Sequence, residues 1–316
     1  MLAAVISACG GSDAAEPANP GGSAGASGSG SSNAGASGLG AQPSDIAQWP
    51  MPNSPDSGLP NSQSYDAATT PGVVHDAVTG LNWLQSPGSE LYSRADALSL
   101  CDQLSFAGSD DWRLPSFIEL VSLFNAAPNE ADPLTPLYIS PVFEAKGRYW
   151  TAPSLSANGL GRLLDFTADG CSAVMACSVG VAAKVDEVLG GAFCVRTDAP
   201  WPTSARYETN GDQVKDLRTG LTWITVAANV QTSGYEDAVS TCKAVGNGAR
   251  LPSINEALSI LVPNLVSKAF PRWPDSAFAW SSSQVPAVPG SHWVAAIGGA
   301  TRADAADSHN RVQCVR

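Results

Sequence analysis

One frame of residues occurs twice in this chain, and the duplication limits the fold more than any other feature. The frame V-x-D-x-x-T-G-L-x-W spans residues 74–83 and returns over 214–223. A tight turn at Thr-Gly between two apolar segments favours a β-hairpin with a buried tryptophan in its second strand. We therefore expect two tandem domains of one design, over residues 64–198 and 205–316.

Two predicted helices follow the hairpin in each copy. The first carries a cysteine on an apolar stripe with helical spacing. The second begins after R-L-P-S at 113–116 and 250–253, where Glu119 and Glu256 complete S-x-x-E capping boxes. We interpret these two glutamates as helix caps rather than catalytic acids. The apolar positions of the helices are Ala97, Leu98, Cys101, Leu104, Phe117, Leu120, Val121 and Phe124 in the first copy, and Tyr235, Ala238, Val239, Cys242, Val245, Ile254, Ala257, Leu258 and Leu261 in the second.

Both copies end on the same pair of predicted strands. An aromatic strand is expected at 149–151 and 279–281, and a closing C-V-R strand at 194–196 and 314–316. A long segment rich in Gly, Ala and Ser separates the two strands in each copy. The tryptophans that recur in both copies are expected in the core: Trp83, Trp150, Trp223 and Trp280. Trp112, which has no counterpart in the second copy, is expected there as well.

The N-terminus resembles the end of a bacterial lipoprotein signal, over residues 1–9. An aliphatic residue and two small residues precede Cys9, which would receive the lipid. The apolar run is short and lacks a basic start, which we interpret as a start codon assigned too far downstream. An ordinary disordered N-terminus with a stray cysteine is the alternative. With Gly10 after the cysteine, the pattern resembles outer-membrane sorting, so we expect a cell-envelope protein facing the periplasm or the cell surface.

Residues 10–63 are mainly Gly, Ser, Ala, Asn and Pro, with Trp49 and Met51 as isolated bulky exceptions. Such a segment buries too little apolar surface to offset its ordering entropy. We therefore predict a disordered tether between the anchor and the first domain. No other stretch approaches 18 apolar residues, so the sequence predicts no membrane-spanning helix.

The cysteines form a disulfide framework if Cys9 is lipidated, because six of the seven then remain. If the two copies carry equivalent disulfides, Cys101 pairs with Cys194 and Cys242 pairs with Cys314. Each bond then joins the first helix of a copy to its last strand. The third pair, Cys171 with Cys177, would close a local loop in the first copy alone. Their spacing does not fit a zinc knuckle, and no thiol remains for nucleophilic catalysis.

The net negative charge of the chain limits the kinds of partner it can bind. The chain has 17 Lys and Arg against 29 Asp and Glu, which argues against nucleic acid and other polyanions. The first copy has a net charge of −9 and the second of +1. Either the two copies present different binding surfaces, or the charges have drifted on solvated faces.

The order of T-G-L-x-W, cysteine helix, R-L-P-S-x-x-E, aromatic strand and C-V-R resembles the Lcl-type C-terminal domain, a family named after the end domain of a collagen-like bacterial adhesin. The resemblance covers 64–198 and 205–316. It implies an α+β fold of two tandem C-type-lectin-like domains, each with two helices and small antiparallel sheets. The N- and C-terminal strands would be adjacent, and long irregular loops would lie at about 155–190 and 284–309.

The resemblance also implies possible ligands, but this sequence differs from the related proteins in two respects. The calcium-dependent sugar motifs of true C-type lectins, E-P-N or Q-P-D followed by W-N-D, do not occur. The family's adhesin is associated with sulfated polysaccharides, which the acidic first copy would repel. The second copy, with Arg272, Arg302 and Arg311, suits a polyanion better, although scattered surface charges explain these arginines as well.

Candidate ligand-binding residues lie in the expected loops. Trp293 is a candidate for stacking on a sugar ring. Carboxylates of the first copy form a candidate calcium site or a solvated surface. The remaining candidates are a polar group before the last strand of the second copy. The residues are Asp165 and Asp169, with Asp186 and Glu187 beside them, and Asp304, Asp307, His309 and Asn310.

The function expected from these features is that of a surface-tethered, non-catalytic binding or adhesion module. No G-x-S-x-G, H-E-x-x-H or phosphate-loop motif occurs, and we expect no enzyme activity, cofactor or metal. The expected partners are the membrane, through the lipid, and a glycan or an envelope or host-surface protein. A structural envelope component without a discrete ligand is one alternative, and an enzyme of the formylglycine-generating branch is another. The oligomeric state is not predicted.

Overall fold

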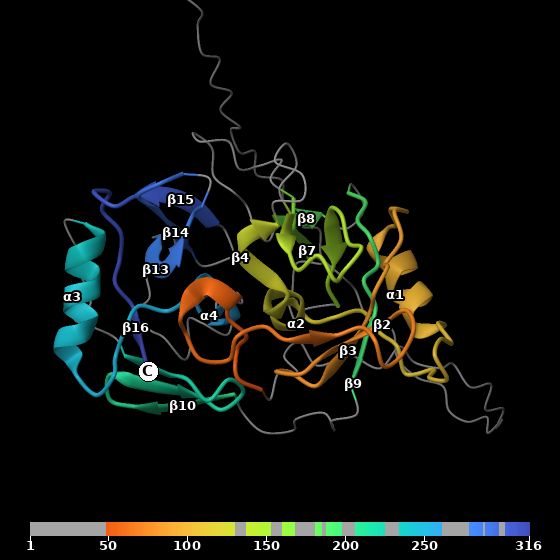
Figure 1. The fold of residues 1–316 in the computed structure, drawn as a ribbon, viewed down its shortest axis with the longest axis horizontal. Coiled ribbons are helices and arrows are strands. Elements are labelled where there is room, and N and C mark those ends of the chain that lie inside the picture. The colour runs from red at the N-terminus through yellow and green to blue at the C-terminus, as the bar shows by residue number, and fades with distance from the viewer. Residues whose placement is uncertain are drawn as a thin grey trace, which may run out of the picture. The chain divides into compact units, whose positions relative to one another are not determined.

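Two four-stranded antiparallel sheets with equivalent strand order organise the fold (Figure 1). In repeat one (residues 64–198) the order is β1-β2-β3-β9, and in repeat two (205–316) it is β10-β11-β12-β16. The last strand of each repeat pairs with the second strand of the predicted hairpin, so both ends of a repeat meet in one sheet. The mixed α+β class expected from the sequence is confirmed.

The computed structural model describes residues 49–129, 137–152, 160–167, 181–184, 188–197, 206–224, 234–260, 278–286, 288–296 and 301–316; for 127–129, 160–162 and 181–184 it describes the backbone alone. Residues Ala41–Arg316 form one compact unit, and Met1–Gly40, the other unit, lie outside the described residues. No described helix has both the length and the apolar character needed to cross a bilayer.

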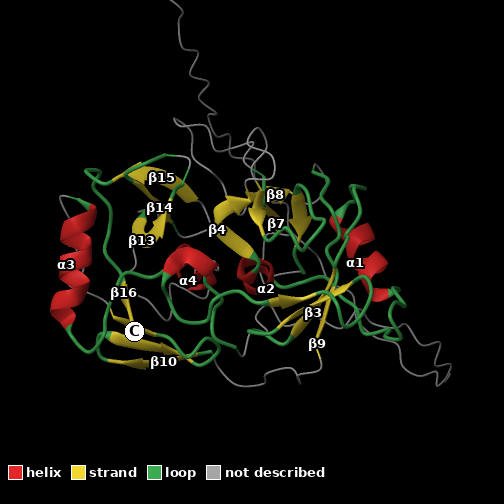
Figure 2. Cartoon of the chain, viewed as in Figure 1, coloured by secondary structure: helices red, strands yellow, loops and turns green. Residues whose placement is uncertain are grey.

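The elements of repeat one, preceded by the 3₁₀ helix η1 (Pro55–Ser57), are β1 (Tyr65–Asp66), β2 (Val73–Asp76), β3 (Leu81–Leu84), α1 (Arg94–Asp102), α2 (Phe117–Ser122), β4 (Phe124–Asn129), β5 (Leu137–Ile139), β6 (Arg148–Trp150), β7 (Leu160–Asp165), β8 (Val181–Lys184) and β9 (Val195–Thr197). Those of repeat two are β10 (Tyr207–Asn210), β11 (Gln213–Asp216), β12 (Thr222–Ile224), α3 (Tyr235–Val245), α4 (Ile254–Ile260), β13 (Ala279–Gln284), β14 (Ser291–Ala295), β15 (Thr301–Ala305) and β16 (Cys314–Val315). Figure 2 shows the helices and strands in the same view.

The duplicated frame forms the predicted hairpin in both repeats. Trp83 and Trp223 lie in register opposite the first valine of the frame, and both are completely buried. The turn reaches a left-handed conformation at its glycine, with φ of 71° at Gly80 and 75° at Gly220. A side chain strains that conformation, which explains the glycine in the frame.

Both predicted disulfides of the described residues are confirmed. Cys101 is bonded to Cys194 and Cys242 to Cys314, each with 5.4 Å between its Cα atoms. Each bridge ties the first helix of a repeat to its closing strand. Loops of 93 and 72 residues are closed, which stabilises the fold by about 4–5 kcal/mol each on the chain-entropy model. Cys171 and Cys177 lie outside the described residues.

The expected irregular loops contain strands instead. Within 155–190 lie β7 and β8, which pair with β6, and within 284–309 lie β14 and β15, which pair with β13. Strands β14 and β15 are paired over five residues each. The prediction of irregular structure was wrong for these stretches because small residues and flanking glycines concealed their strand pattern.

The second helices of the two repeats, α2 and α4, lie side by side at the centre of the molecule (Figures 1 and 2). Around them, one hydrophobic cluster draws on both repeats. Trp293 of repeat two is completely buried and meets the rings of Phe124 and Tyr138 edge-on, with centroids 5.8 and 5.5 Å away. The two repeats therefore share a core.

The end of the expected tether is part of this fold. Trp49 and Met51 are only 8% and 1% exposed. The Gln63 amide donates to the carbonyls of Ser122 and Phe124, at 2.8 and 3.0 Å. The prediction of disorder is thus wrong for 49–63, because two large apolar side chains and paired polar groups offset the ordering entropy. Residues 10–48 lie outside the described residues.

A polar cleft as the candidate functional site

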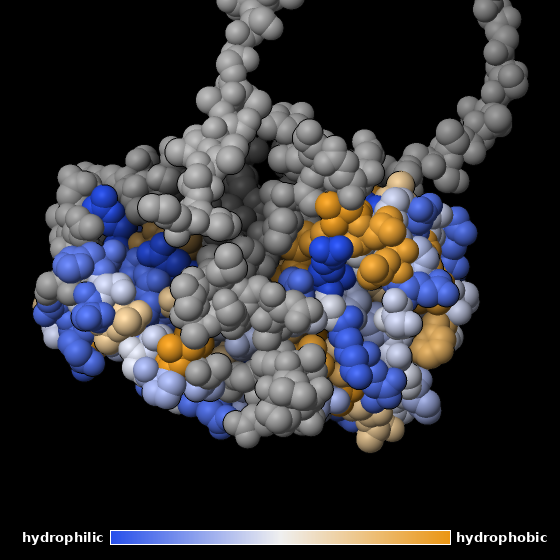
Figure 3. All heavy atoms as spheres, turned by 90° about the horizontal axis from the view of Figure 1, so that it is seen from above, coloured by the Kyte–Doolittle hydropathy of each residue, from blue (hydrophilic) through white to orange (hydrophobic). Residues whose placement is uncertain are grey.

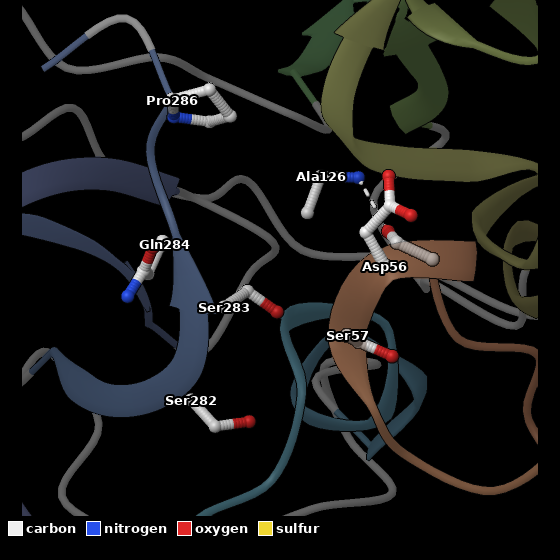
Figure 4. A pocket seen from close by; sticks show the side chains of 8 residues that line it. Asp56, Ser57, Ala126, Ser282, Ser283, Gln284 and Pro286 are labelled. Carbon is white, nitrogen blue, oxygen red and sulfur yellow. Dashed lines mark hydrogen bonds between the residues drawn. The ribbon is translucent and has the colours of Figure 1, made fainter.

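A cleft of about 300 Å³ lies where the segment before repeat one meets repeat two (Figure 4). The 3₁₀ helix η1 and its flanking residue form one wall, and the end of β13 forms the other. Ala126 of β4 contributes to the lining as well. The polar lining residues are Ser54, Asp56, Ser57, Ser282, Ser283 and Gln284, and Pro286 completes the wall.

Local structure fixes the two walls. Ser54 precedes η1 and accepts a 2.8 Å hydrogen bond from the Ala126 amide, which joins this wall to β4. The opposite wall is irregular, because the register of β13 shifts between Trp280 and Gln284. In Figure 4, Ser282 and Ser283 both point toward η1, whereas Gln284 lies on the other side of the strand. A β-bulge redirects side chains in this way.

The serines of the cleft are also joined to the start of α4. The Ser283 hydroxyl accepts a 3.0 Å hydrogen bond from the Ile254 amide, and the Ser282 hydroxyl donates to the Pro252 carbonyl at 3.2 Å. These bonds hold both side chains in place before any ligand binds. Among the described residues, Asp56 has no hydrogen bond or ion pair. Its exposed carboxylate gives the cleft a single negative charge.

The glutamates of the R-L-P-S-x-x-E motif are engaged in the fold. Glu119 accepts from the Ser116 amide at 2.8 Å and from both terminal nitrogens of Arg113. Glu256 does the same with Ser253 and Arg250. The predicted capping boxes are confirmed in both repeats, and the arginine partner is an addition that the sequence reasoning missed.

Asp76 and Asp216 stabilise the hairpin turns of the two repeats, but only Asp216 has an arginine beside its carboxylate. Arg206 donates to both carboxylate oxygens of Asp216, at 3.0 and 2.8 Å. Ser64 takes the position of Arg206 in repeat one, and Asp76 Oδ2 has no hydrogen-bond partner among the described residues. Burial raises the pKa of Asp76, although hydrogen bonds from the turn act in the opposite sense. These aspartates are turn-forming residues.

The structure places Trp293 in the shared core, with no ring face exposed. Stacking of this ring on a sugar, as expected from the sequence, does not fit the position. Trp293 was expected to lie in a loop with its ring accessible. It lies instead in the middle of β14, in register with Ala303 of β15. Its role is therefore that of a core residue.

The predicted polar group of repeat two is only partly brought together. Asp304 is 9% exposed and is held by Arg302, at 2.7 and 2.8 Å, and by Asn310 at 2.8 Å. Asp307 and His309 are exposed beside it. Since Asp304 and Asn310 bind each other, their polar atoms are already engaged within the protein.

Of the candidate carboxylates of repeat one, Asp165 lies among the described residues. Asp165 accepts from the Thr167 amide and hydroxyl at 2.9 and 2.7 Å, which makes it a local turn residue. Asp169, Asp186 and Glu187 lie outside the described residues. Among the described side chains, no group of three or more His, Cys, Asp or Glu is arranged to hold a metal ion.

An aromatic stack in repeat two was not anticipated. His292 lies on the Tyr235 ring with centroids 3.5 Å apart and planes 12° from parallel, and Trp280 meets both rings edge-on. Burial lowers the pKa of His292, while Glu236 acts in the opposite direction. The stack fixes α3 against the sheet that contains β14.

Apolar surface offers a weaker candidate. Leu91 and Leu189 are 54% and 50% exposed and flank the bridge between Tyr92 and Gly190. Figure 3 shows hydrophobic residues gathered in the right half of one face, with hydrophilic residues among them. The cleft has polar groups set for recognition, whereas the chemistry of this surface selects no particular ligand.

Sequence reasoning missed the cleft because its walls are more than 200 residues apart in the chain. Two local signals were available, the turn-forming run Ser54-Pro55-Asp56-Ser57-Gly58 and the triple serine at 281–283. Neither indicates that the other lies opposite.

Residues 72–172 match the family model of the Lcl C-terminal domain. The resemblance inferred from the motifs of repeat one is thereby confirmed over these residues. No curated protein matches the chain in sequence.

Proposed function

We propose that this chain, in which residues 72–172 belong to the Lcl C-terminal domain family, is a surface-tethered binding or adhesion module without catalytic activity. Its ligand would be a glycan or a protein of the envelope or of a host surface. The observation that carries the proposal is the polar cleft, whose side chains are held in place by the fold while Asp56 remains unpaired among the described residues. Preorganised polar groups in a concave site are typical of ligand recognition.

A C-type-lectin-like architecture for the two repeats belongs to this proposal. It is supported by the sheet that joins the beginning and end of each repeat, and by the disulfide from the first helix to the closing strand. The absence of catalysis is supported by the motif glutamates, because Glu119 and Glu256 are engaged by arginine and by helix caps. A buried carboxylate held in this way is not free to transfer a proton to a substrate.

Binding is tested with the full chain, labelled and applied to an array of neutral, acidic and sulfated glycans and to intact bacterial and host cells. Saturable retention by one class of ligand is the expected result. The chain unfolded in urea with its disulfides reduced serves as the unfolded control and should bind nothing. If the folded chain is retained by no glycan and by no cell surface, the module has no discrete ligand, and a structural role in the envelope replaces this proposal.

The tether is tested separately, with the chain expressed behind a complete lipoprotein signal. The native chain should fractionate with membranes, and Cys9→Ser should move to the soluble fraction because it has no thiol to receive the lipid. Ser12→Thr, near Cys9 but outside the signal motif, controls for a general effect on export. Unchanged membrane association of Cys9→Ser would refute the anchor.

A further inference from the structure

We propose that the cleft between η1 and β13 binds an uncharged, polyhydroxylated ligand, of the size of one or two sugar units. The inference rests on the proposed binding function and adds to it a site and a class of ligand. It depends on the hydrogen bonds that the lining side chains have already made, on the charge of the cleft, and on its position at the junction of the repeats.

The hydroxyls of the cleft are divided between donors and acceptors. Ser54 and Ser283 each accept from a backbone amide, so each hydroxyl proton remains available to a ligand. Ser282 donates to the Pro252 carbonyl, so its oxygen lone pairs remain to accept. A ligand that satisfies this wall must both donate and accept within a short distance. Neighbouring hydroxyls of a sugar do both.

The charge of the cleft narrows the ligand further. Asp56 is the one charged side chain in the lining, and its carboxylate accepts hydrogen bonds without donating any. It repels a sulfate or carboxylate group and accepts readily from a hydroxyl. The cleft therefore favours neutral saccharides over sulfated ones.

The size and position of the cleft agree with a small ligand. Its volume of about 300 Å³ is at the lower end of the range for small-molecule sites. One wall precedes repeat one and the other belongs to repeat two. The walls are held together because Asn255 of α4 donates to the Pro52 carbonyl at 3.1 Å, close to Ser54 in the chain. One repeat alone lacks half of the site.

The test uses the full chain and matched oligosaccharides that differ only in sulfation. Affinities are measured by calorimetry, and ligand protons in contact are identified by saturation-transfer NMR. The neutral form should bind, and the sulfated form should bind at least about 10-fold more weakly. Asp56→Asn should weaken binding of the neutral ligand by about 10-fold, since the amide oxygen of Asn accepts a weaker hydrogen bond than the carboxylate does. Ser282→Ala should weaken it by a smaller factor.

Asp102→Asn is the matched control, because it removes the same charge from an exposed site at the end of α1. It should bind as the native chain does. Near-ultraviolet circular dichroism of each variant reports whether the fold is retained, and Asp56→Asn should keep it because Asp56 is exposed.

Three outcomes overturn the inference. Unchanged binding of a glycan by both cleft variants places the ligand elsewhere and leaves the proposed binding function intact. Retention of sulfated glycans or proteins, but of no neutral saccharide, contradicts the class of ligand and again leaves that function. Absence of all binding removes both proposals.

Discussion

The guanidinium of Arg113 and the carboxylate of Glu119 meet through two hydrogen bonds of 2.9 and 2.8 Å, with side chains only 7% and 0% exposed. The backbone of Arg113 also pairs with Val195 of β9. The pair thus fastens the start of α2 to the closing strand of the repeat. Arg250 and Glu256 repeat the arrangement, with Arg250 more exposed, at 27%. The motif R-L-P-S-x-x-E is therefore a structural joint.

Replacing Arg113 with Met should lower the free energy of unfolding by about 3–5 kcal/mol, because Glu119 then remains buried without a countercharge. Arg250→Met should cost less, since water reaches that side chain. Adding Glu119→Gln to Arg113→Met should recover part of the loss. Urea unfolding followed by tryptophan fluorescence measures each value.

Arg196→Met provides the control for this series. Its partner Asp111 is 48% exposed and Arg196 itself 21%, so water screens this pair and it should contribute at most about 1 kcal/mol. If Arg113→Met costs no more than Arg196→Met, the buried pair is not the joint described here.

Asn255 connects the repeats through three carbonyls, those of Pro52, Val121 and Phe124, at 3.1, 3.4 and 2.7 Å. Asn255→Ala should cost about 2–3 kcal/mol, because it removes the side-chain donor of the Pro52 carbonyl and leaves the Phe124 carbonyl with Gln63 as its side-chain donor. Asn255→Asp should cost more, because a carboxylate would face the same carbonyls. Hydrogen exchange should show faster opening of residues 49–63 in both variants. Exchange unchanged from the native chain would contradict this role.

Shortening the chain separates the packed part of the N-terminal segment from the rest. Removal of 1–40, which form the other unit, should leave the unfolding midpoint unchanged. Removal of 1–63 should lower the free energy of unfolding by several kcal/mol, since it exposes the core sites of Trp49 and Met51 and removes the Gln63 hydrogen bonds. Thermal unfolding of the two shortened chains measures the difference. Equal midpoints would mean that residues 49–63 do not contribute to stability.

His292 should make stability depend on pH. Burial lowers its folded-state pKa below the ordinary value of about 6.5, so the unfolded chain takes up a proton that the folded protein resists. Its contribution is complete above that pH and declines as the pH falls toward the lowered pKa. Glu236 opposes this lowering of the His292 pKa without reversing it, and Asp304, in register opposite, is engaged by Arg302 and Asn310.

His292→Phe keeps an aromatic ring beside Tyr235 and should flatten the stability profile between about pH 7 and pH 5. Urea midpoints at a series of pH values measure the slope. The exposed His309, changed to Gln, is the control and should leave the slope as it is. A His292→Phe profile parallel to the native one would refute the assignment.

The elements that the sequence predicts are those encoded locally. The Thr-Gly turns, the S-x-x-E caps and the helical stripes each depend on residues within one or two turns of the chain. The structure contains the turns and the caps, and it contains the stripes except at three positions: Leu104 follows the end of α1, Phe124 lies in β4, and Leu261 lies outside the described residues. The two disulfides could be predicted although their cysteines are far apart in sequence, because each copy has one cysteine at each of the same two positions of the frame.

What the sequence did not predict depends on contacts over long separations. Trp293 was interpreted as a loop residue because it lies within the expected loop at 284–309, yet its partners Phe124 and Tyr138 belong to the other repeat. Trp49 and Met51 stood out from their surroundings, but nothing nearby indicated a core to receive them. The cleft was missed for the same reason, since its walls are formed by segments with no shared motif.

The packed segment at 49–63 also determines how the molecule would carry a mechanical load. A pull applied through the N-terminus reaches Trp49 and Met51 before it reaches the first strand of either sheet. To extend the chain, the pull must extract both side chains from a cluster to which both repeats contribute. Tension would therefore be shared between the two repeats, and repeat one would not have to bear it as an isolated hairpin.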